Sequence, residues 1–379
     1  MNGSWIFILM VIVFITVYSL LNYYFLRKHR NVTNLKPFPG ILVKLVLITI
    51  ILTPVATIIF SQHGPPFLAA ITGFTGYSWL AFLFLFLVIH GLADLGLFIL
   101  KLLGFASDPK TARILFFITL VLNISILVYG SYEARQIRIE YVNVPTTKLP
   151  IGTKNLKLIQ LSDIHFSPLT GPNTAQTLLD IVIQEKPDLI VITGDLLDSG
   201  IKKEDEVISI LQQMQAPKGK YAITGNHEFF AGIEKSTSFI QQAGFKLLRN
   251  EAVSVEDKIT LVGMDDPTVK RFDESIDIAE GKILKNLNHE KFTLLLKHQP
   301  RIEESSLDYF DLQLSGHTHA GQIFPFTLLV KIAFPYLCGM YQLDTDTQLY
   351  VSRGTGTWGP PFRFLAPPEV TVISLVNGN

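Results

Sequence analysis

Four long apolar runs lie in the first third of this 379-residue chain, and they limit its possible folds more than any other feature. They cover residues 4–26, 41–60, 77–100 and 114–132. Each is close to the roughly 20 residues that an α-helix needs to cross a bilayer core. A buried helix of a soluble protein can be equally apolar, but four such runs with short links are typical of a membrane protein. We therefore predict four transmembrane α-helices within residues 1–135.

The first run does not have the features of a cleaved signal peptide. It lacks a basic segment at its start, and Arg27, Lys28 and Arg30 follow it where a small-residue cleavage site would be expected. The composition of the whole chain agrees with an anchored protein, because only 17% of the residues are charged and the mean hydropathy is +0.35.

Basic residues in the links between these runs predict the orientation of the helices. The links after the first and third runs contain Arg27, Lys28, Arg30, Lys36, Lys101, Lys110 and Arg113. Residues 61–76, between the second and third runs, contain no Lys or Arg. Since basic links tend to stay in the cytoplasm, the chain after residue 132 is predicted to be extracytoplasmic.

His90 and Asp94 lie in the third run, four residues apart and therefore on one helix face. Ionisable groups at membrane depth are costly, so a functional role is one interpretation. The other is that they hydrogen-bond to each other or to a neighbouring helix and fix the packing. We favour packing, because no other predicted helix offers a matching set of charged partners.

The rest of the chain has the mixed polarity of a globular domain. We predict a linker over residues 136–154, of which 137–144 reads as a strand, and a soluble domain over 155–379. Amphipathic segments at residues 174–185 and 202–214 predict helices. Short apolar runs predict strands at residues 156–161, 188–192, 220–223, 259–262, 292–296, 312–314, 349–351 and 370–375. This alternation indicates a layered α/β architecture.

Charge and cysteine content exclude some classes of protein. The formal net charge is zero, whereas a nucleic-acid binder would show a basic patch or stripe, so no nucleic-acid partner is expected. Cys338 is the single cysteine, so no intrachain disulfide can form.

Five of the predicted strands are each followed by side chains of the types that bind metals. These side chains are Asp163 and His165; Asp195 and Asp198; Asn226 and His227; His298; and His317 and His319. Loops at the carboxyl ends of strands converge in open α/β sheets. Carboxylate and amide oxygens with imidazole nitrogens suit Mn, Fe, Zn or a similar divalent ion. One such segment could be only a turn, but five in order predict a metal site.

These segments resemble the motifs of one enzyme family. In chain order they read Asp163-x-His165, Gly194-Asp195-x-x-Asp198, Gly225-Asn226-His227-Glu228, His298 and Gly316-His317-x-His319. Together they resemble the calcineurin-like metallophosphoesterases, over about residues 155–375. With the anchor and the segments 352–356 and 359–364, the chain is similar to a membrane-anchored bacterial branch. The resemblance implies a four-layer αββα sandwich after four transmembrane helices, in a multi-pass protein of the bacterial cell membrane.

The resemblance also implies roles for the residues of the motifs. One divalent ion would be held by Asp163, His165 and His319, a second by Asn226, His298 and His317, and Asp195 would bridge the two. A hydroxide between the ions would attack the phosphorus of a monoester, diester or pyrophosphate. His227 would contact the phosphate and serve as a candidate general acid.

Two further residues are weaker candidates. Asp198 is interpreted as orienting a ligand histidine, a common role for carboxylates near metals. Arg363 is a candidate substrate contact because arginine binds phosphate in a bidentate manner, although a loop arginine such as Arg363 or Arg353 is more often structural.

Residues 322–341 form an unusually apolar segment after the last ligand histidine. It reads either as a hairpin that completes the core or as a lip that meets the bilayer or an acyl chain. The second interpretation predicts a lipid-linked phosphate ester as substrate. One alternative function is a catalytically silent membrane signalling or scaffolding protein, which would be expected to lack some of the ligands. Another is a transporter that uses His90 and Asp94.

Overall fold

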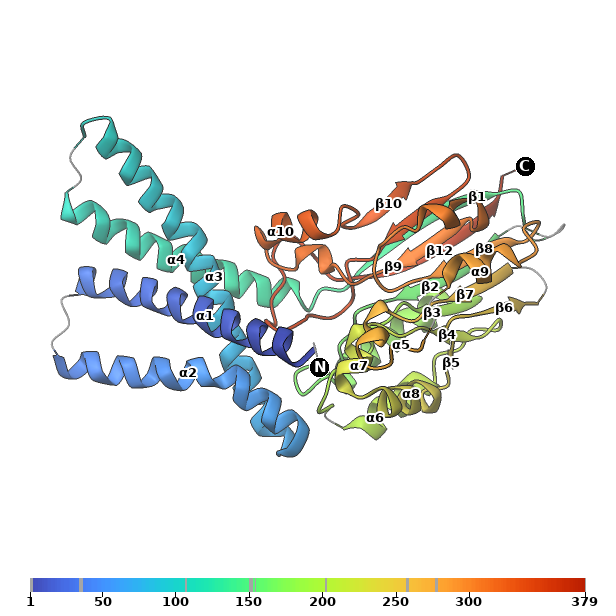
Figure 1. Cartoon of the computed structure of the whole chain (residues 1–379), viewed down its shortest axis with the longest axis horizontal. Helices are drawn as coiled ribbons and strands as arrows, with labels where there is room; N and C mark the ends of the chain where they lie inside the picture. Colours follow the sequence, from blue (N-terminus) through green and yellow to red (C-terminus); the bar gives the residue numbers. More distant parts are fainter. Residues whose placement is uncertain are drawn as a thin grey trace. The chain divides into compact units, whose positions relative to one another are not determined.

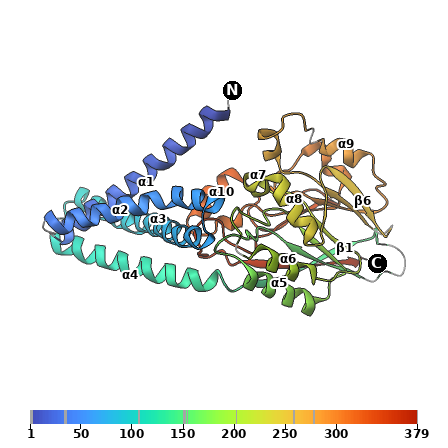
Figure 2. The ribbon, with the colours of Figure 1, turned by 90° about the horizontal axis from the view of Figure 1, so that it is seen from below.

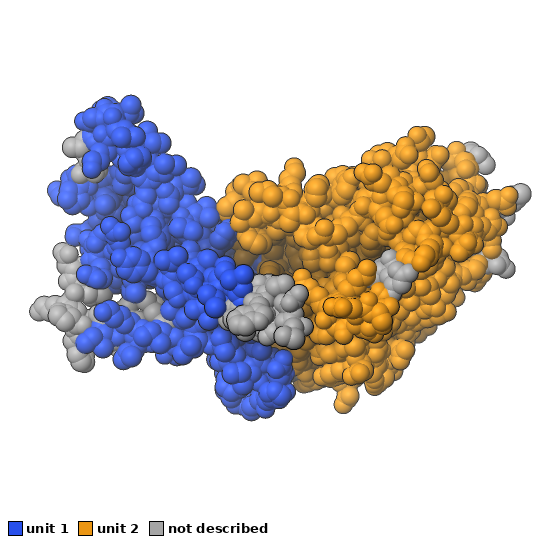
Figure 3. Space-filling model, in the orientation of Figure 1, with its two compact units in different colours: residues 1–132, 359–362 blue, residues 133–358, 363–379 orange. Residues whose placement is uncertain are grey.

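The computed structural model describes residues 3–33, 37–105, 108–149, 153, 155–201, 203–256, 259–276 and 279–378. The chain divides into two compact units, shown in different colours in Figure 3. Unit 1 contains residues 1–132 and 359–362, and unit 2 contains residues 133–358 and 363–379.

The helices of unit 1 follow the four apolar runs (Figure 1). They are α1 (Gly3–Thr33), α2 (Pro37–His63), α3 (Pro66–Leu102) and α4 (Pro109–Glu133). Within the described residues, α3 and α4 are the two helices that are long and apolar enough to span a membrane, and a shorter apolar segment covers Ile48–His63. The described part of the chain therefore supplies two candidate spans where the sequence predicted four.

Polar side chains of α3 in unit 1 find partners on two other helices. Lys28 of α1 forms an ion pair with Asp94 (Nζ–Oδ2 2.6 Å), and the Tyr24 hydroxyl donates to the same oxygen at 2.8 Å. His90 Nδ1 lies 3.2 Å from Thr119 Oγ1 of α4. The expectation that no other helix offers a charged partner was wrong, because α1 continues to Thr33 and so includes Lys28. These contacts support a packing role for both residues.

Unit 2 contains two six-stranded sheets. The first has the order β1-β12-β2-β3-β4-β5 and the second β10-β11-β9-β8-β7-β6. The strands of the first sheet are β1 (Arg138–Thr146), β2 (Asn155–Leu161), β3 (Leu189–Ile192), β4 (Lys220–Ala222), β5 (Lys246–Leu247) and β12 (Glu369–Asn377). Those of the second are β6 (Glu251–Val255), β7 (Ile259–Gly263), β8 (Phe292–Leu296), β9 (Leu312–Ser315), β10 (Gly339–Gln342) and β11 (Gln348–Val351).

Both sheets are mixed, and their central strands are parallel. Strands β2, β3 and β4 are parallel neighbours, as are β7, β8 and β9. Their carboxyl ends therefore meet at one edge of each sheet. Strand β12 runs antiparallel to β2 and parallel to β1 along the whole length of β1, so the segment expected to be a linker contributes an edge strand.

Helices connect these strands in unit 2. The α-helices are α5 (Pro172–Glu185), α6 (Glu204–Gln212), α7 (Asn226–Ala231), α8 (Ile233–Gln242), α9 (Glu280–Lys285) and α10 (Phe326–Ala333). The 3-10 helices are η1 (Pro267–Arg271), η2 (Glu304–Tyr309) and η3 (His319–Gly321). Figure 2 shows α5 and α6 beside each other, away from α9.

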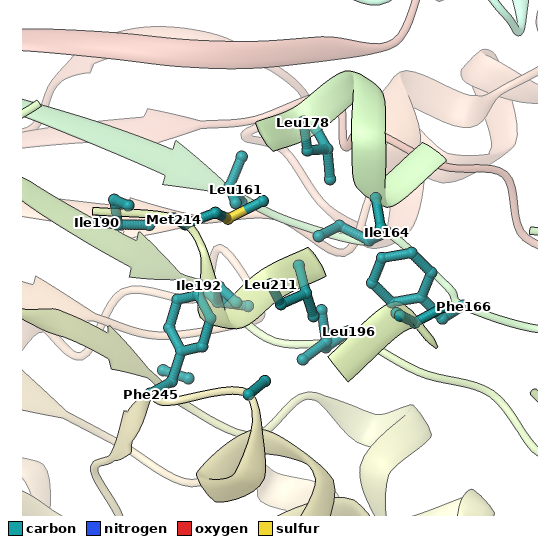
Figure 4. Packing of buried hydrophobic residues seen from close by; sticks show 14 of the residues in the cluster. Leu161, Ile164, Phe166, Leu178, Ile190, Ile192, Leu196, Leu211, Met214 and Phe245 are labelled. Atoms are coloured by element: carbon teal, nitrogen blue, oxygen red, sulfur yellow. The ribbon is translucent and has the colours of Figure 1, made fainter. Parts of the chain in front are cut away.

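Three hydrophobic clusters join the layers of unit 2. One lies between the sheets and includes Leu158 of β2 and Leu294 of β8. A second packs α5, α6 and α8 on the outer face of the first sheet, with Leu178, Ile192 and other residues shown in Figure 4. A third packs α9 on the outer face of the second sheet. The order of layers is helix, sheet, sheet, helix. Strand β8 is therefore covered on both faces, and all five of its residues are buried, four of them apolar.

The core between the sheets gives a stability prediction. Leu294 is fully buried there, and Leu294→Ala should reduce the free energy of unfolding by about 2–5 kcal/mol because it leaves a cavity. Urea denaturation of the detergent-purified full chain, followed by circular dichroism, measures the change. Leu169→Ala, at a 40% exposed leucine, is the matched control and should be nearly neutral. Equal destabilisation by the two substitutions would contradict this description of the core.

Candidate metal centre

The chain turns sharply after β2 and places two candidate ligands side by side. Asp163 and His165 both have a left-handed backbone with φ of 52°, and both side chains are buried. The Asp163 carboxylate accepts a hydrogen bond from the backbone N–H of His317 (2.9 Å) and another from the Ser162 hydroxyl (2.5 Å). The end of β2 is therefore linked directly to the loop after β9.

A second turn follows β3 and is held by a residue to which the sequence assigned no role. Asp195 has φ of 51°, and the buried Glu228 carboxylate accepts from the backbone N–H groups of Asp195 (3.0 Å) and Leu196 (2.8 Å). Glu228 also accepts from the Gly225 N–H at 2.6 Å. Glu228 therefore fixes the loop after β3 to the start of α7. In the sequence, only its place at the end of the Gly225-Asn226-His227-Glu228 motif could have indicated this role.

The three residues expected to hold the first ion lie together. Asp163, His165 and His319 each present a ligand atom within 4.8 Å of the others. The two Nε2 atoms of His165 and His319 are 3.1 Å apart, and His319 Nε2 lies 3.4 Å from Asp163 Oδ1.

The residues expected to hold the second ion form an adjoining group. Ligand atoms of Asp195, His298 and His317 also lie within 4.8 Å of one another. His298 Nε2 is 3.2 Å from Asp195 Oδ2 and 3.1 Å from His317 Nδ1. Asp195 Oδ2 lies 3.8 Å from His165 Nε2 of the first group, so Asp195 occupies the position between the groups that a bridging ligand needs.

Asn226 provides a separate test of whether the residues fit a cation. It is the first residue of α7, its side chain is only 8% exposed, and its Oδ1 atom is buried with no hydrogen-bond partner among the described residues. A buried acceptor without a partner costs free energy. A divalent ion at the second group would supply the missing partner, so Asn226 fits the role expected of it.

Asp198 contacts two histidines with one oxygen. Its Oδ1 lies 3.1 Å from His165 Nδ1 and 2.6 Å from His227 Nδ1. A hydrogen on His165 Nδ1 leaves its Nε2 atom with a lone pair for a metal, which is the orientation that the sequence interpretation of Asp198 requires. The His227 side chain is 18% exposed and its Nε2 lies 4.0 Å from Asp195 Oδ2, so it borders the group from the solvent side.

The charged groups of this cluster shift one another's pKa values. Burial raises the pKa of the Asp195 carboxyl, but His298 and His227 outweigh burial and hold that pKa well below its usual range. Burial lowers the pKa of His227, but Asp195 and Asp198 raise it to about 9. Burial and His298 lower the pKa of His317 to about 3. Asp195 therefore keeps its negative charge at the centre of the cluster.

Arg363 lies in a different environment from the one that a substrate contact requires. It is fully buried, and its guanidinium donates to the carbonyl oxygens of Gly356 (3.0 Å) and Arg353 (2.8 Å). Its Nη2 atom also lies 3.1 Å from His319 Nδ1. A substrate has no access to a side chain in this position. Arg363 instead links the loop that contains Arg353 and Gly356 to the candidate ligand His319.

Aromatic residues border the cluster, and the sequence interpretation included Phe334 as part of the apolar segment 322–341 but not Phe230 or Phe272. On one side, the ring of Phe230 lies 5.8 Å from that of His227 and 6.4 Å from that of Phe272, and both phenylalanines are exposed. On the other side, the ring of Phe334 lies 4.8 Å from that of His317. An isolated phenylalanine gives no sequence signal of such a position.

Comparison with known proteins agrees with this geometry. Residues 156–321 match the Calcineurin-like phosphoesterase family. An uncharacterised metallophosphoesterase of Aquifex aeolicus is 37% identical over 249 residues, which cover 65% of this chain and 95% of that protein. The chain belongs to the calcineurin-like metallophosphoesterase family. It is therefore a metal-dependent phosphoester hydrolase.

Two further proteins are similar to parts of this phosphoesterase. A Danio rerio "Transmembrane protein with metallophosphoesterase domain" is 35% identical over 272 residues, which cover 68% of this chain and 62% of that protein. A solved dimetal phosphatase from Danio rerio aligns with a TM-score of 0.35 and 11% identity, over 54% of this chain and 89% of that one. The latter likeness is too low to bear on activity.

The cluster predicts a joint loss of metal and activity. Asp195→Ala and His319→Ala should each reduce bound metal and lower turnover by about 1,000-fold or more, because the ions position and polarise the phosphoryl group. Elemental analysis of the purified variants and hydrolysis assays measure the two losses. Asp180→Ala and His289→Ala, at residues outside the cluster, are the controls. Normal turnover with a full metal complement in either cluster variant would show that the ligand assignment is wrong.

Proposed function

We propose that this phosphoesterase is a membrane-anchored dinuclear-metal enzyme that cleaves a monoester, diester or pyrophosphate bond of a lipid-linked substrate. The observation that supports two ions is the adjoining pair of ligand groups with Asp195 between them. The proposed ligands are Asp163, His165 and His319 for one ion, and Asn226, His298 and His317 for the other.

The chemistry divides between the ions and the protein. Two divalent ions in such a site, with Mn, Fe and Zn as candidates, supply a hydroxide nucleophile near neutral pH and neutralise phosphoryl charge. Asp195 holds its charge between the two groups, and Asp198 orients His165 and His227. His227 lies at the solvent-facing border, where Asp195 and Asp198 raise its pKa against the effect of burial, and it is the proposed proton donor to the leaving oxygen.

The lipid component of the proposal rests on α10. None of the eight residues of this helix is buried, and Leu328, Leu329 and Ile332 are exposed, Ile332 to 81%. The helix is followed directly by Phe334, which contacts the ring of His317. Within the apolar segment 322–341, residues 326–333 therefore form an exposed helix and residues 339–341 belong to β10. Exposed apolar helices of this kind bind at the boundary between headgroups and acyl chains.

Chain connectivity also favours a lipid substrate. Helix α4, one of the two candidate spans, ends at Glu133, and β1 begins at Arg138. A catalytic unit that follows a membrane helix so closely in sequence encounters lipid esters at high local concentration. We further propose that all four helices of unit 1 cross the bacterial membrane and that the catalytic unit is extracytoplasmic.

Metal-dependent hydrolysis of a small ester tests the catalytic proposal. The detergent-purified chain should hydrolyse bis(p-nitrophenyl) phosphate or p-nitrophenyl phosphate, lose activity with a chelator, and recover it with Mn²⁺. Elemental analysis should find about two ions per chain. A catalytically silent scaffold would bind metal but hydrolyse neither ester with any metal tested. That result would reject the catalytic proposal.

Charged substitutions on α10 test the lipid component separately. Phe326→Asp and Leu329→Asp should lower hydrolysis of a phospholipid or polyprenyl phosphate in mixed micelles by about tenfold or more, because a charge opposes burial of the helix in lipid. Hydrolysis of p-nitrophenyl phosphate in the same micelles should change far less. Ile183→Asp, at an exposed isoleucine of α5, is the matched control. Equal losses of activity on the lipid and on p-nitrophenyl phosphate would contradict a role of α10 in lipid binding.

A further inference from the structure

Arg301 lies beside the candidate metal centre on an aromatic platform. It follows His298 by three positions, in the loop after β8, and its guanidinium carbon lies 5.0 Å from the centre of the Phe334 ring. The same ring lies 4.8 Å from the ring of His317. Phe334 therefore joins an exposed arginine to a residue of the second ligand group.

Among the described residues, the charge of Arg301 has no acidic partner. Its Nε donates to Gln299 Oε1 at 2.9 Å, and Gln299 in turn donates to Asp266 Oδ2 at 2.9 Å. These bonds orient the guanidinium and leave both of its terminal nitrogens unbonded to any described residue. Arg301 also forms no ion pair with a carboxylate anywhere in the part of the chain that the structure describes.

Three other arginines of unit 2 have guanidinium groups that are already bonded to described residues. Arg249 pairs with Asp265, Arg353 pairs with Glu369, and Arg363 is buried among carbonyl oxygens. Arg301 is exposed, oriented by Gln299, and has a guanidinium edge that is free to bind an anion. A planar guanidinium of this kind recognises phosphate oxygens in a bidentate manner.

We propose that Arg301, supported by Phe334, binds a negatively charged oxygen of the substrate beside His317 and makes this site prefer phosphate groups with a second negative charge. A terminal phosphate or a pyrophosphate offers that charge, whereas a simple diester carries a single charge. The inference rests on the proposed function and narrows its substrate class. Phe334 directly follows α10, so the proposed anion site adjoins the proposed lipid-binding helix.

Steady-state kinetics with two small esters test this proposal. Arg301→Gln should raise KM for p-nitrophenyl phosphate and the inhibition constant of inorganic phosphate by about 10- to 100-fold, the effect of a lost hydrogen-bonded charge. The loss with bis(p-nitrophenyl) phosphate should be several-fold smaller. Arg301→Lys, which keeps the charge but not the planar guanidinium, should restore part of the phosphate affinity.

Controls separate recognition from general damage. Lys285→Gln removes an exposed cation over the ring of Tyr309, outside the ligand groups, and should leave all constants unchanged. Metal content of Arg301→Gln should equal that of the wild type. Unchanged phosphate inhibition, equal losses on both esters, or loss of metal would each overturn the proposal. Failure of the proposed function differs from these outcomes, because then the wild-type chain itself would hydrolyse neither ester.

Discussion

The candidate metal centre depends on backbone turns that L-amino acids rarely adopt. Asp163, His165, Asp195, His317 and His319 all have left-handed φ values between 48° and 70°. Each such residue costs about 1–2 kcal/mol relative to an ordinary conformation. Hydrogen bonds between the loops offset this cost. The N–H of Asp163 donates to Gly194 O and that of His165 to Asp195 O, each at 3.1 Å, so the turns after β2 and β3 hold each other.

Glycines permit the close approach of these turns. A Cβ atom on Gly225 would lie 2.2 Å from Asp195 Oδ1, and one on Gly316 would lie 2.1 Å from Asp163 Oδ2. These glycines allow the main chain to pass directly against the central carboxylates. The Glu228 carboxylate then accepts hydrogen bonds from four N–H groups of two of the loops. The charged side chains are thus gathered by main-chain geometry.

The sequence predicted the parts of this structure whose signals are local. Strands such as β8 have continuous apolar runs, and the candidate ligands follow strand ends directly, so both could be located. Strands β5, β6 and β10 were missed, because β5 has two residues and β6 and β10 expose much of their surface. Lys28 was placed in a link because the apolar run ends before α1 does. The environment of Arg363 and the position of Arg301 depend on contacts with distant segments, which spacing along the chain does not reveal.

Two kinds of structure meet at His317, and they have different consequences for function. Its backbone N–H binds Asp163, which ties it to the turns that gather the ligands. Its ring contacts Phe334, which belongs to a loop and helix with little buried surface. The turns are constrained by strain and by glycine contacts, so substitutions there are expected to disturb the candidate ligands. Leu328, Leu329 and Ile332 of α10 are exposed, so their charge and hydrophobicity can vary with less effect on the candidate ligands. The proposed substrate contacts at α10, Phe334 and Arg301 are therefore distinct from the strand ends that carry the candidate metal ligands.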